Sequence, residues 1–241
     1  MTTERLAIEL VGVRKAFGRT EAVKGIDLAV PPGTFLGLIG HNGAGKSTLL
    51  QMLMGNLRPT EGSVEVGGVD VGADPRGARE RMGAVPEHPP LFEWLNAREF
   101  FEFVAEVRGV ADIGIAIEVA NLGDDAERLI REYSQGMRRR TALGAAMLGE
   151  PQVLLLDEAL NGLDPPSAAR VKALLRDAVQ GGQTVLLSTH VVETVQSVAD
   201  RVVMLEQGEV KVDKRTEELG DDGIEALFQS QLSRDPARPP G

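Results

Sequence analysis

A short motif near residue 40 strongly limits what this chain can fold into. Residues 40–48 read Gly-His-Asn-Gly-Ala-Gly-Lys-Ser-Thr and contain the pattern G-x-x-x-x-G-K-[ST]. Glycines let the backbone wrap closely around a polyphosphate, so that successive N–H groups point at it. Lys46 can then reach the outer phosphates as a point charge, and the Ser47 hydroxyl can hold Mg²⁺. The motif therefore predicts that the chain binds a nucleoside triphosphate.

The motif requires a strand before the loop and a helix after it, and both can be read from the sequence. Residues 34–39 form a short apolar run typical of a buried strand, and residues 46–54 carry apolar side chains at helical spacing. Further strands are expected at 63–66, 83–85, 153–156, 184–187 and 201–205, with a helix at about 166–179. Apolar strands that alternate with helices indicate a parallel sheet covered on both faces.

The rest of the chain divides into three further regions. The first thirty residues alternate in the manner of strands, which predicts a β-rich N-terminal portion. Residues from about 89 to 148 carry apolar positions three and four apart and predict an inserted helical subdomain. We expect one domain over residues 1–218, followed by an acidic and then proline-rich tail at 219–241 that is loosely ordered.

Composition narrows the class of protein. No stretch approaches the roughly 18 uninterrupted apolar residues of a membrane-spanning helix, and no secretion signal is visible at the N-terminus. The chain has no cysteine, which excludes disulfides and agrees with a cytosolic setting. A net charge of −10 argues against broad attraction to nucleic acid or anionic lipid. The arginine run at 138–140 is an exception, which we expect to be a solvated helix face with i,i+4 partners.

Polar residues follow two of the expected strands, at the sheet edge where ligands bind in doubly wound folds. Asp157 follows one apolar run and suits the Mg²⁺ shell of a bound triphosphate. Glu158 can orient and deprotonate an attacking water. His190 follows another strand and can contact the transferring phosphate or hold the water and base in register. His41 and His88 lack the paired spacing of a metal site, and we assign neither to metal binding.

A second helix start adds another candidate site for an anion. Residues 133–137 read Tyr-Ser-Gln-Gly-Met, and Ser134 and Gly136 open a helical stretch. A helix start offers unpaired N–H groups and the positive end of a dipole. Ser134 can also cap the helix. The chain therefore carries two devices that can bind phosphate.

Five segments in order give the chain a family resemblance: residues 40–48, 133–137, 154–158 (Leu-Leu-Leu-Asp-Glu), 161–164 (Asn-Gly-Leu-Asp) and 188–190 (Ser-Thr-His). Over roughly residues 4–215 the chain resembles the nucleotide-binding subunit of an ATP-binding cassette (ABC) transporter. The resemblance implies an α/β fold: a P-loop NTPase core with a mostly parallel sheet, an N-terminal antiparallel β subdomain and an inserted α-helical signature subdomain. It also implies two subunits packed head to tail, with each ATP between the phosphate loop of one and the signature of the other.

By position, the resemblance implies a role for each motif residue. The phosphate-binding residues would be Gly40, His41, Asn42, Gly43, Ala44, Gly45, Lys46, Ser47 and Thr48. The catalytic residues would be Lys46, Glu158 as general base and His190 as the switch, and the Mg²⁺ ligands would be Ser47, Glu87 and Asp157. Phe17 would stack on adenine, Ser134 and Gly136 would bind the partner's γ-phosphate, and Asp164 would organise the dimer interface.

Other uses of some of these residues stay open. Phe17 is equally suited to an ordinary core position, and Asp164 to capping the helix that starts at the prolines after it. The segment Leu91-Phe-Glu-Trp-Leu95 lies where the family contacts its membrane partner, although Phe92 and Trp94 are as well suited to packing inside the helical subdomain.

The departures from the family pattern leave the chemistry intact. Glu87 stands where many members carry glutamine, and a carboxylate can still bind Mg²⁺, so we expect a competent ATPase. Pro86-Glu87 and the Ser-x-Gly-Met signature are similar to ATPase subunits of the ABC-2 type, many of which drive export of drugs, lipids or polysaccharides.

The resulting hypothesis is a cytoplasmic ATPase subunit, using ATP and Mg²⁺, that binds a second ATPase subunit and separate transmembrane permease subunits. It would lie on the inner face of the cell membrane only through those partners. The alternative is a soluble ABC ATPase acting on nucleic acid or the ribosome. The single cassette, the missing cysteine pairs and the acidic net charge speak against that alternative, and we expect no nucleic-acid partner. A nonhydrolysing binding module is a third possibility, which the intact Glu158 and His190 do not favour.

Overall fold

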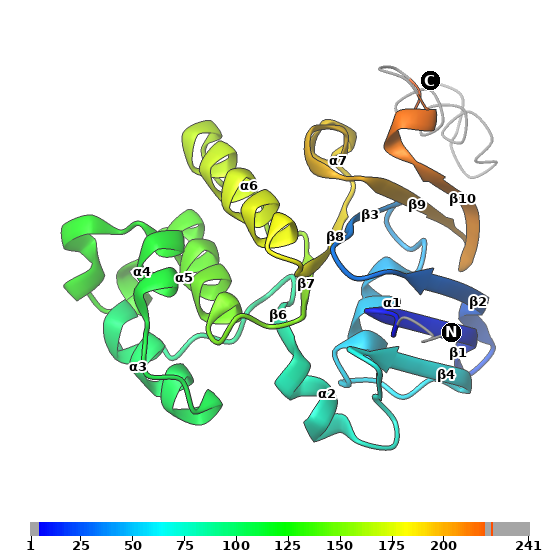
Figure 1. The fold of residues 1–241 in the computed structure, drawn as a ribbon, viewed down its shortest axis with the longest axis horizontal. Coiled ribbons are helices and arrows are strands. Elements are labelled where there is room, and N and C mark those ends of the chain that lie inside the picture. Colours follow the sequence, from blue (N-terminus) through cyan, green and yellow to red (C-terminus); the bar gives the residue numbers. More distant parts are fainter. Residues whose placement is uncertain (1–4, 220–222, 224–241) are drawn as a thin grey trace.

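The computed structural model describes residues 5–219 and residue 223, which fold around two β sheets (Figure 1). The strands are β1 (Ile8–Phe17), β2 (Thr20–Val30), β3 (Phe35–Ile39), β4 (Glu61–Val66), β5 (Val69–Asp70), β6 (Met82–Val85), β7 (Val153–Asp157), β8 (Thr184–Thr189), β9 (Arg201–Glu206) and β10 (Glu209–Arg215). The helices are α1 (Lys46–Leu53), α2 (Pro75–Arg81), α3 (Ala97–Arg108), α4 (Gly114–Ala120), α5 (Gln135–Met147), α6 (Pro165–Gln180) and α7 (Val192–Val198). Short 3₁₀ helices span Gly123–Glu127, Ile130–Glu132 and Thr216–Glu218. The predicted tail at 219–241 lies outside the described residues except for Leu219 and Gly223.

The larger sheet holds the strands that lead to the predicted site. Its order is β10-β9-β3-β8-β7-β6, with β10 antiparallel to β9 and the other neighbours parallel. The register places Ile39 beside Thr189, and Asp157 beside Ser188. The carboxyl ends of β3, β7 and β8 therefore meet at one edge of the sheet. Together with the antiparallel sheet β2-β1-β4-β5, this topology confirms the predicted fold class.

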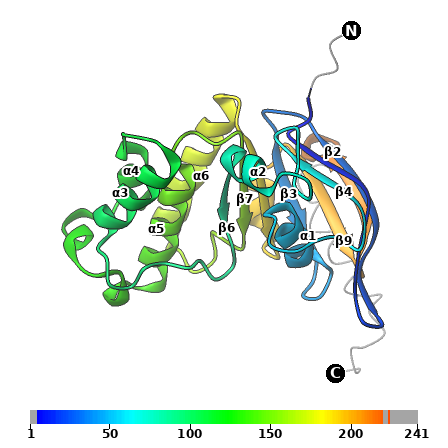
Figure 2. The same cartoon turned by 90° about the horizontal axis from the view of Figure 1, so that it is seen from below.

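Side chains of the central strands alternate between two cores, as the period of a β strand requires. Leu36 and Leu38 of β3 pack toward α1 and the antiparallel sheet, so that α1 lies between the two sheets (Figure 2). Phe35 and Ile39 point to the opposite face, which α5, α6 and α7 cover. Burial on both faces explains why these strands read as continuous apolar runs in the sequence.

Helices α3, α4 and α5 form a lobe at one end of the molecule (Figure 1) around a third apolar core. The lobe packs tightly at two glycines. A Cβ added at Gly144 would lie 2.5 Å from the carbonyl oxygen of Ala116, so α5 and α4 touch through their backbones. A Cβ added at Gly83 of β6 would lie 1.9 Å from the carbonyl oxygen of Ala146, where α5 rests on the sheet. The bounds of the helical subdomain at about 89–148 and of the domain at 1–218 stay a prediction.

Besides the two-residue strand β5 and the 3₁₀ helix at Thr216–Glu218, three elements have no counterpart among the predictions. They are α2, α7 and the edge strand β10, each of which is short or mixed in polarity. Within residues 5–219 and 223, no helix has both the length and the apolar character needed to cross a membrane.

Candidate functional site

The phosphate loop joins β3 to α1, and its glycines occupy positions that other residues would strain. Gly45 has a left-handed φ of 105°, and a Cβ there would lie 2.6 Å from the carbonyl oxygen of Ala22. A Cβ at Gly40 would lie 2.4 Å from the carbonyl oxygen of Leu205. Gly43, with a φ of 83°, faces open space. Other backbone segments therefore pack against the loop at Gly40 and Gly45, whereas Gly43 is open to solvent, as a backbone cradle for an anion requires.

Lys46 lies folded over this loop. Its ammonium group donates hydrogen bonds to the carbonyl oxygens of Gly40 at 2.6 Å and His41 at 3.2 Å. Burial lowers the pKa of Lys46, and the negative charges of Glu158, Asp157 and Glu87 act in the opposite direction. The predicted lysine and the three predicted carboxylates thus share one electrostatic environment.

The loop borders a cleft of about 500 Å³. Its lining residues are Phe17, Ala22, His41, Asn42, Gly43, Gly45, Lys46, Ser47, Thr48, Glu87 and Glu158. Phe17 is 52% exposed, and the ammonium of Lys15 lies 5.3 Å from the centroid of its ring. This exposure rules out the core position that the sequence left open for Phe17. Its contact with a nucleobase stays a prediction.

Asp157 has the environment of a cation ligand. It is buried at the end of β7, and its Oδ1 has no hydrogen-bond partner. Burial raises the pKa of Asp157, and the nearby hydroxyls of Ser188 and Ser47 offset part of this shift. Carboxylate and hydroxyl oxygens are the hard donors that Mg²⁺ prefers, usually completed by substrate phosphates. Among the described residues, no group of three or more His, Cys, Asp or Glu side chains could hold a metal alone.

Glu158 occupies a tight turn directly after β7. Its backbone has a left-handed φ of 50°, which is uncommon for a residue with a side chain. Its N–H donates to the carbonyl oxygen of Ser188 at 3.0 Å. One carboxylate oxygen, Oε1, lies 2.9 Å from Nδ1 of His190, and the other, Oε2, accepts a hydrogen bond from Nδ2 of Asn161 at 2.7 Å. The structure thus brings Glu158 and His190 together from two strands, as the sheet topology predicts.

The arginine run at 138–140 does not form the solvated face that we predicted. Arg139 is 9% exposed, and its guanidinium donates to the carbonyl oxygen of Glu158 at 2.6 Å. Arg138 pairs with Glu93, and Arg140 donates to the Ser167 hydroxyl. None of these partners is an i,i+4 neighbour. The prediction was wrong because α5 starts at the junction of the lobe and the sheet, where neighbouring segments surround the helix.

Asn161 and Arg139 are the contacts of Glu158 that the sequence prediction missed. Arg139 is 19 residues from Glu158 along the chain, and its sequence neighbours are also arginines, so no local signal distinguishes it. Asn161 lies three residues after Glu158 and before Gly162, which is a spacing typical of a turn. That spacing is the sequence signal that could have identified Asn161 as a contact of Glu158.

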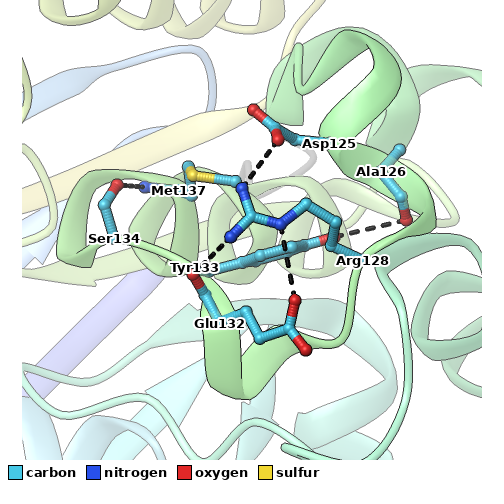
Figure 3. Close-up of polar contacts among 7 residues, drawn as sticks. All are labelled: Asp125, Ala126, Arg128, Glu132, Tyr133, Ser134 and Met137. Carbon is cyan, nitrogen blue, oxygen red and sulfur yellow. Dashed lines mark hydrogen bonds and ion pairs between the residues drawn. The ribbon is translucent and has the colours of Figure 1, made fainter.

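The second anion device lies at the start of α5 (Figure 3). Ser134 caps this helix, since its hydroxyl accepts a hydrogen bond from the N–H of Met137 at 3.3 Å. The preceding turn is tied by Arg128, which pairs with Asp125 and Glu132, and by the Tyr133 hydroxyl, which donates to Ala126 (Figure 3).

The start of α5 does not border the cleft at the phosphate loop of the same chain. Ser134 is exposed, and neither Ser134 nor Gly136 lines the cleft. A Cβ added at Gly136 would lie 3.4 Å from the carbonyl oxygen of Gly162, so this helix start packs beside the turn that follows Glu158. A phosphate bound at Ser134 would therefore not share the cleft of its own chain.

Asp164 caps α6, one of the two uses that the sequence left open for it. Its carboxylate accepts hydrogen bonds from the N–H of Ser167 at 2.9 Å and from the Ser167 hydroxyl at 2.7 Å. These bonds hold the pKa of Asp164 below its usual range. The Asp164 carboxylate remains exposed, and its role at a subunit interface stays a prediction.

The two large aromatic residues of the segment before α3, Phe92 and Trp94, lie in different environments. Phe92 packs against Phe100 of the lobe at a centroid distance of 5.9 Å and stacks on Trp94 at 5.4 Å. Trp94 is 69% exposed, so it is not a core residue. Contact of Trp94 with a membrane partner stays a prediction.

Comparisons with known proteins agree with this geometry. A family model described as "ABC transporter" matches residues 23–161. The chain is 38% identical to the daunorubicin resistance ATP-binding protein DrrA3 of Streptomyces coeruleorubidus, over 92% of this chain and 74% of that protein. It is 37% identical to the Nod factor export ATP-binding protein I of Rhizobium sp. (strain N33), over 85% and 69%. It is 32% identical to the bacitracin transport ATP-binding protein BcrA of Enterococcus faecalis, over 88% and 70%.

Solved structures show the same fold. An ATP-binding subunit of an ABC transporter superposes with a TM-score of 0.84 at 24% identity, covering 95% of this chain and 98% of that one. A dimeric post-hydrolysis state of the ATP-binding cassette MJ0796 bound to ADP and Pi superposes with a TM-score of 0.79 at 24% identity, over 87% and 98%. By its family match and its relatives, this chain belongs to the ABC transporter family, as one of its ATP-binding subunits.

Proposed function

We propose that this ATPase subunit uses the cleft at the phosphate loop to hydrolyse ATP and so drives movement of a substrate through separate membrane-spanning subunits. The observation that carries the proposal is the convergence of Lys46, Asp157, Glu158 and His190 at the carboxyl ends of β3, β7 and β8. Phosphoryl transfer to water needs the parts that meet here: one cation, an unpaired buried carboxylate oxygen and a carboxylate held by an imidazole.

The binding roles follow from the donors that each element presents. Backbone N–H groups of residues 40–48 surround the phosphates at the positive end of α1. Lys46 exchanges its hydrogen bonds with the loop carbonyls for phosphate oxygens. Ser47, Asp157 and Glu87 provide the oxygen ligands for Mg²⁺, which when bound neutralises charge on the phosphates. Phe17, exposed at the cleft, stacks on adenine.

Glu158 carries out the proton transfer. The oxygen of a water attacks the γ-phosphorus, the bond to the ADP oxygen breaks, and a carboxylate oxygen of Glu158 accepts the proton of the water. His190 contacts the Glu158 carboxylate. It acts as the switch between Glu158, at the end of β7, and the phosphate. Lys46 stabilises the negative charge that develops on the transferring group.

The active unit is a head-to-tail dimer. Among the described residues, neither Ser134 nor Gly136 at the start of α5 lines the cleft of its own chain. A two-fold interface repeats each contact, because residue i of one subunit meets residue j of the other and the reverse. One interface therefore completes both ATP sites, and Asp164 lies beside the contact between the two subunits. ATP binding closes this interface.

The membrane partners are separate subunits, and the chain reaches the inner face of the cell membrane through them. The relatives named above act in daunorubicin resistance, Nod factor export and bacitracin transport, which supports an export role of the ABC-2 type for this chain. Exposed Trp94, beside the lobe, is a candidate contact with these subunits. The alternative role on nucleic acid or the ribosome is not favoured, since these relatives are ATP-binding proteins named for drug resistance, export or transport and the chain is acidic.

A mixing experiment tests the shared site. Lys46→Ala removes the lysine from both sites of a homodimer, and Ser134→Glu places a carboxylate where each γ-phosphate must bind, so each variant alone should be inactive. In a mixed dimer, one site combines intact Lys46 with intact Ser134. An equal mixture should recover about a quarter of the wild-type rate, because about half of the dimers are mixed and each has one intact site. No recovery, with mixed dimers shown to form, would refute the head-to-tail arrangement.

The transport role needs a test of its own. The tagged full chain should copurify from detergent-solubilised membranes with a protein of about six apolar helices, each of about 20 residues. Copurification with ribosomes or DNA instead would overturn this part of the proposal and favour the alternative.

A further inference from the structure

Glu158 makes more contacts than the proposed chemistry uses. Its carboxylate meets His190 through Oε1 and Asn161 through Oε2. The last torsion of a glutamate side chain is broad and roughly two-fold, so one contact leaves the carboxylate plane free to turn. A second donor on the other oxygen fixes that plane. Asn161 is the residue that supplies it.

The position of Asn161 is itself fixed by Glu158. The N–H of Asn161 donates to the carbonyl oxygen of Glu158 at 3.1 Å, so the two residues share a tight turn. The same carbonyl oxygen accepts a hydrogen bond from buried Arg139, and the N–H of Glu158 binds Ser188. The turn is thus anchored to α5 and β8, and Asn161 is held where its amide reaches the carboxylate.

We propose that Asn161 is a positioning residue, which orients the Glu158 carboxylate for its reaction with water. The proposal rests on the function of Glu158 as general base. His190 is suited to a different task, because its side chain is 53% exposed, whereas Asn161 is half-buried within the turn. A carboxylate has about four acceptor positions, so a bond from Asn161 leaves room for the water.

The first test compares two substitutions of Asn161 in the full-length chain. Asn161→Ala removes the whole amide, and Asn161→Asp keeps the shape but replaces the donor with an acceptor. A small displacement of a reacting group can cost about 100-fold in rate, so both variants should lower kcat by about 10-fold to 100-fold with KM for ATP nearly unchanged. Asn56→Ala is the matched control, because its amide donates to the neutral side chain of Gln51 at the surface.

Asparagine at this place could instead serve only to shape the turn or the subunit interface. A residue that only shapes the turn would lose activity as alanine but keep it as the isosteric aspartate. Wild-type kcat in either Asn161→Ala or Asn161→Asp would therefore overturn the proposal.

A second test separates positioning from contact with a partner subunit. In a Glu158→Gln background, ATP should still bind and hold the dimer, and adding Asn161→Ala should leave both ATP affinity and the dimer fraction unchanged. Loss of the ATP-dependent dimer in the double variant would place Asn161 at the interface and overturn the proposal. Full hydrolysis by Glu158→Gln alone would refute the general-base role itself, and this inference with it.

Discussion

Replacement of Glu158 by glutamine removes a proton acceptor while it preserves the shape of the site. In the native turn both carboxylate oxygens have partners, at 2.9 Å to His190 and 2.7 Å to Asn161. Glutamine can accept the Asn161 amide with its oxygen and donate its own amide to an unprotonated Nδ1 of His190. Since both contacts persist, the free energy of unfolding should change by no more than about 1 kcal/mol.

The effect on the rate should be much larger. A general base contributes about 10² to 10⁴ in rate, so kcat should fall by at least about 100-fold, or about 2.7 kcal/mol of transition-state stabilisation. Phosphate release at saturating MgATP gives kcat, and size-exclusion chromatography with ATP gives the dimer fraction, which should rise because closed dimers no longer turn over. A folded Glu158→Gln variant that binds ATP and retains kcat within about threefold of wild type would refute the reasoning.

Three further perturbations test other parts of the molecule. Phe17→Ala should raise KM for ATP with little change in kcat, since a stacking contact serves ground state and transition state alike; an unchanged KM would remove Phe17 from the site. Gly83→Ala should lower the free energy of unfolding by about 1–3 kcal/mol in urea titrations, because its Cβ would meet the Ala146 carbonyl at 1.9 Å. Asp164 has a lowered pKa, so the stability it contributes over Asp164→Asn should be present at neutral pH and decline as the pH falls below 3.8 through its folded pKa; a pH-independent difference would contradict this.

Much of the sheet could be predicted because its pattern is local. The runs at β3, β7 and β8 are buried on both faces, so each reads as an unbroken apolar stretch. The same burial fixes which polar residues emerge at the strand ends, and it led to Asp157, Glu158 and His190. β8 nevertheless runs through Thr189, so Ser188 and Thr189 are buried strand residues and only His190 follows the strand.

Elements with a weak pattern could not be predicted. β10 is an edge strand with polar side chains on much of its length, and α7 has only seven residues. Their stability comes from contacts with β9 and with the face of the sheet, not from local propensity. The prediction of a solvated face for the arginine run at 138–140 was wrong for a related reason. The sequence does not reveal which other segments surround the first turn of α5.

The sequence by itself determined that the chain binds a nucleotide, since the phosphate loop is a contiguous backbone device whose glycines and lysine need no distant partner. It also determined the family, through the order of its motifs. Only the tertiary structure decided how Glu158 is held. Its contacts come from His190, 32 residues later, and Arg139, 19 residues earlier, together with the amide of Asn161 across a left-handed turn. Contacts between distant segments depend on the packing of α5 and β8 against β7, which no single stretch of sequence encodes.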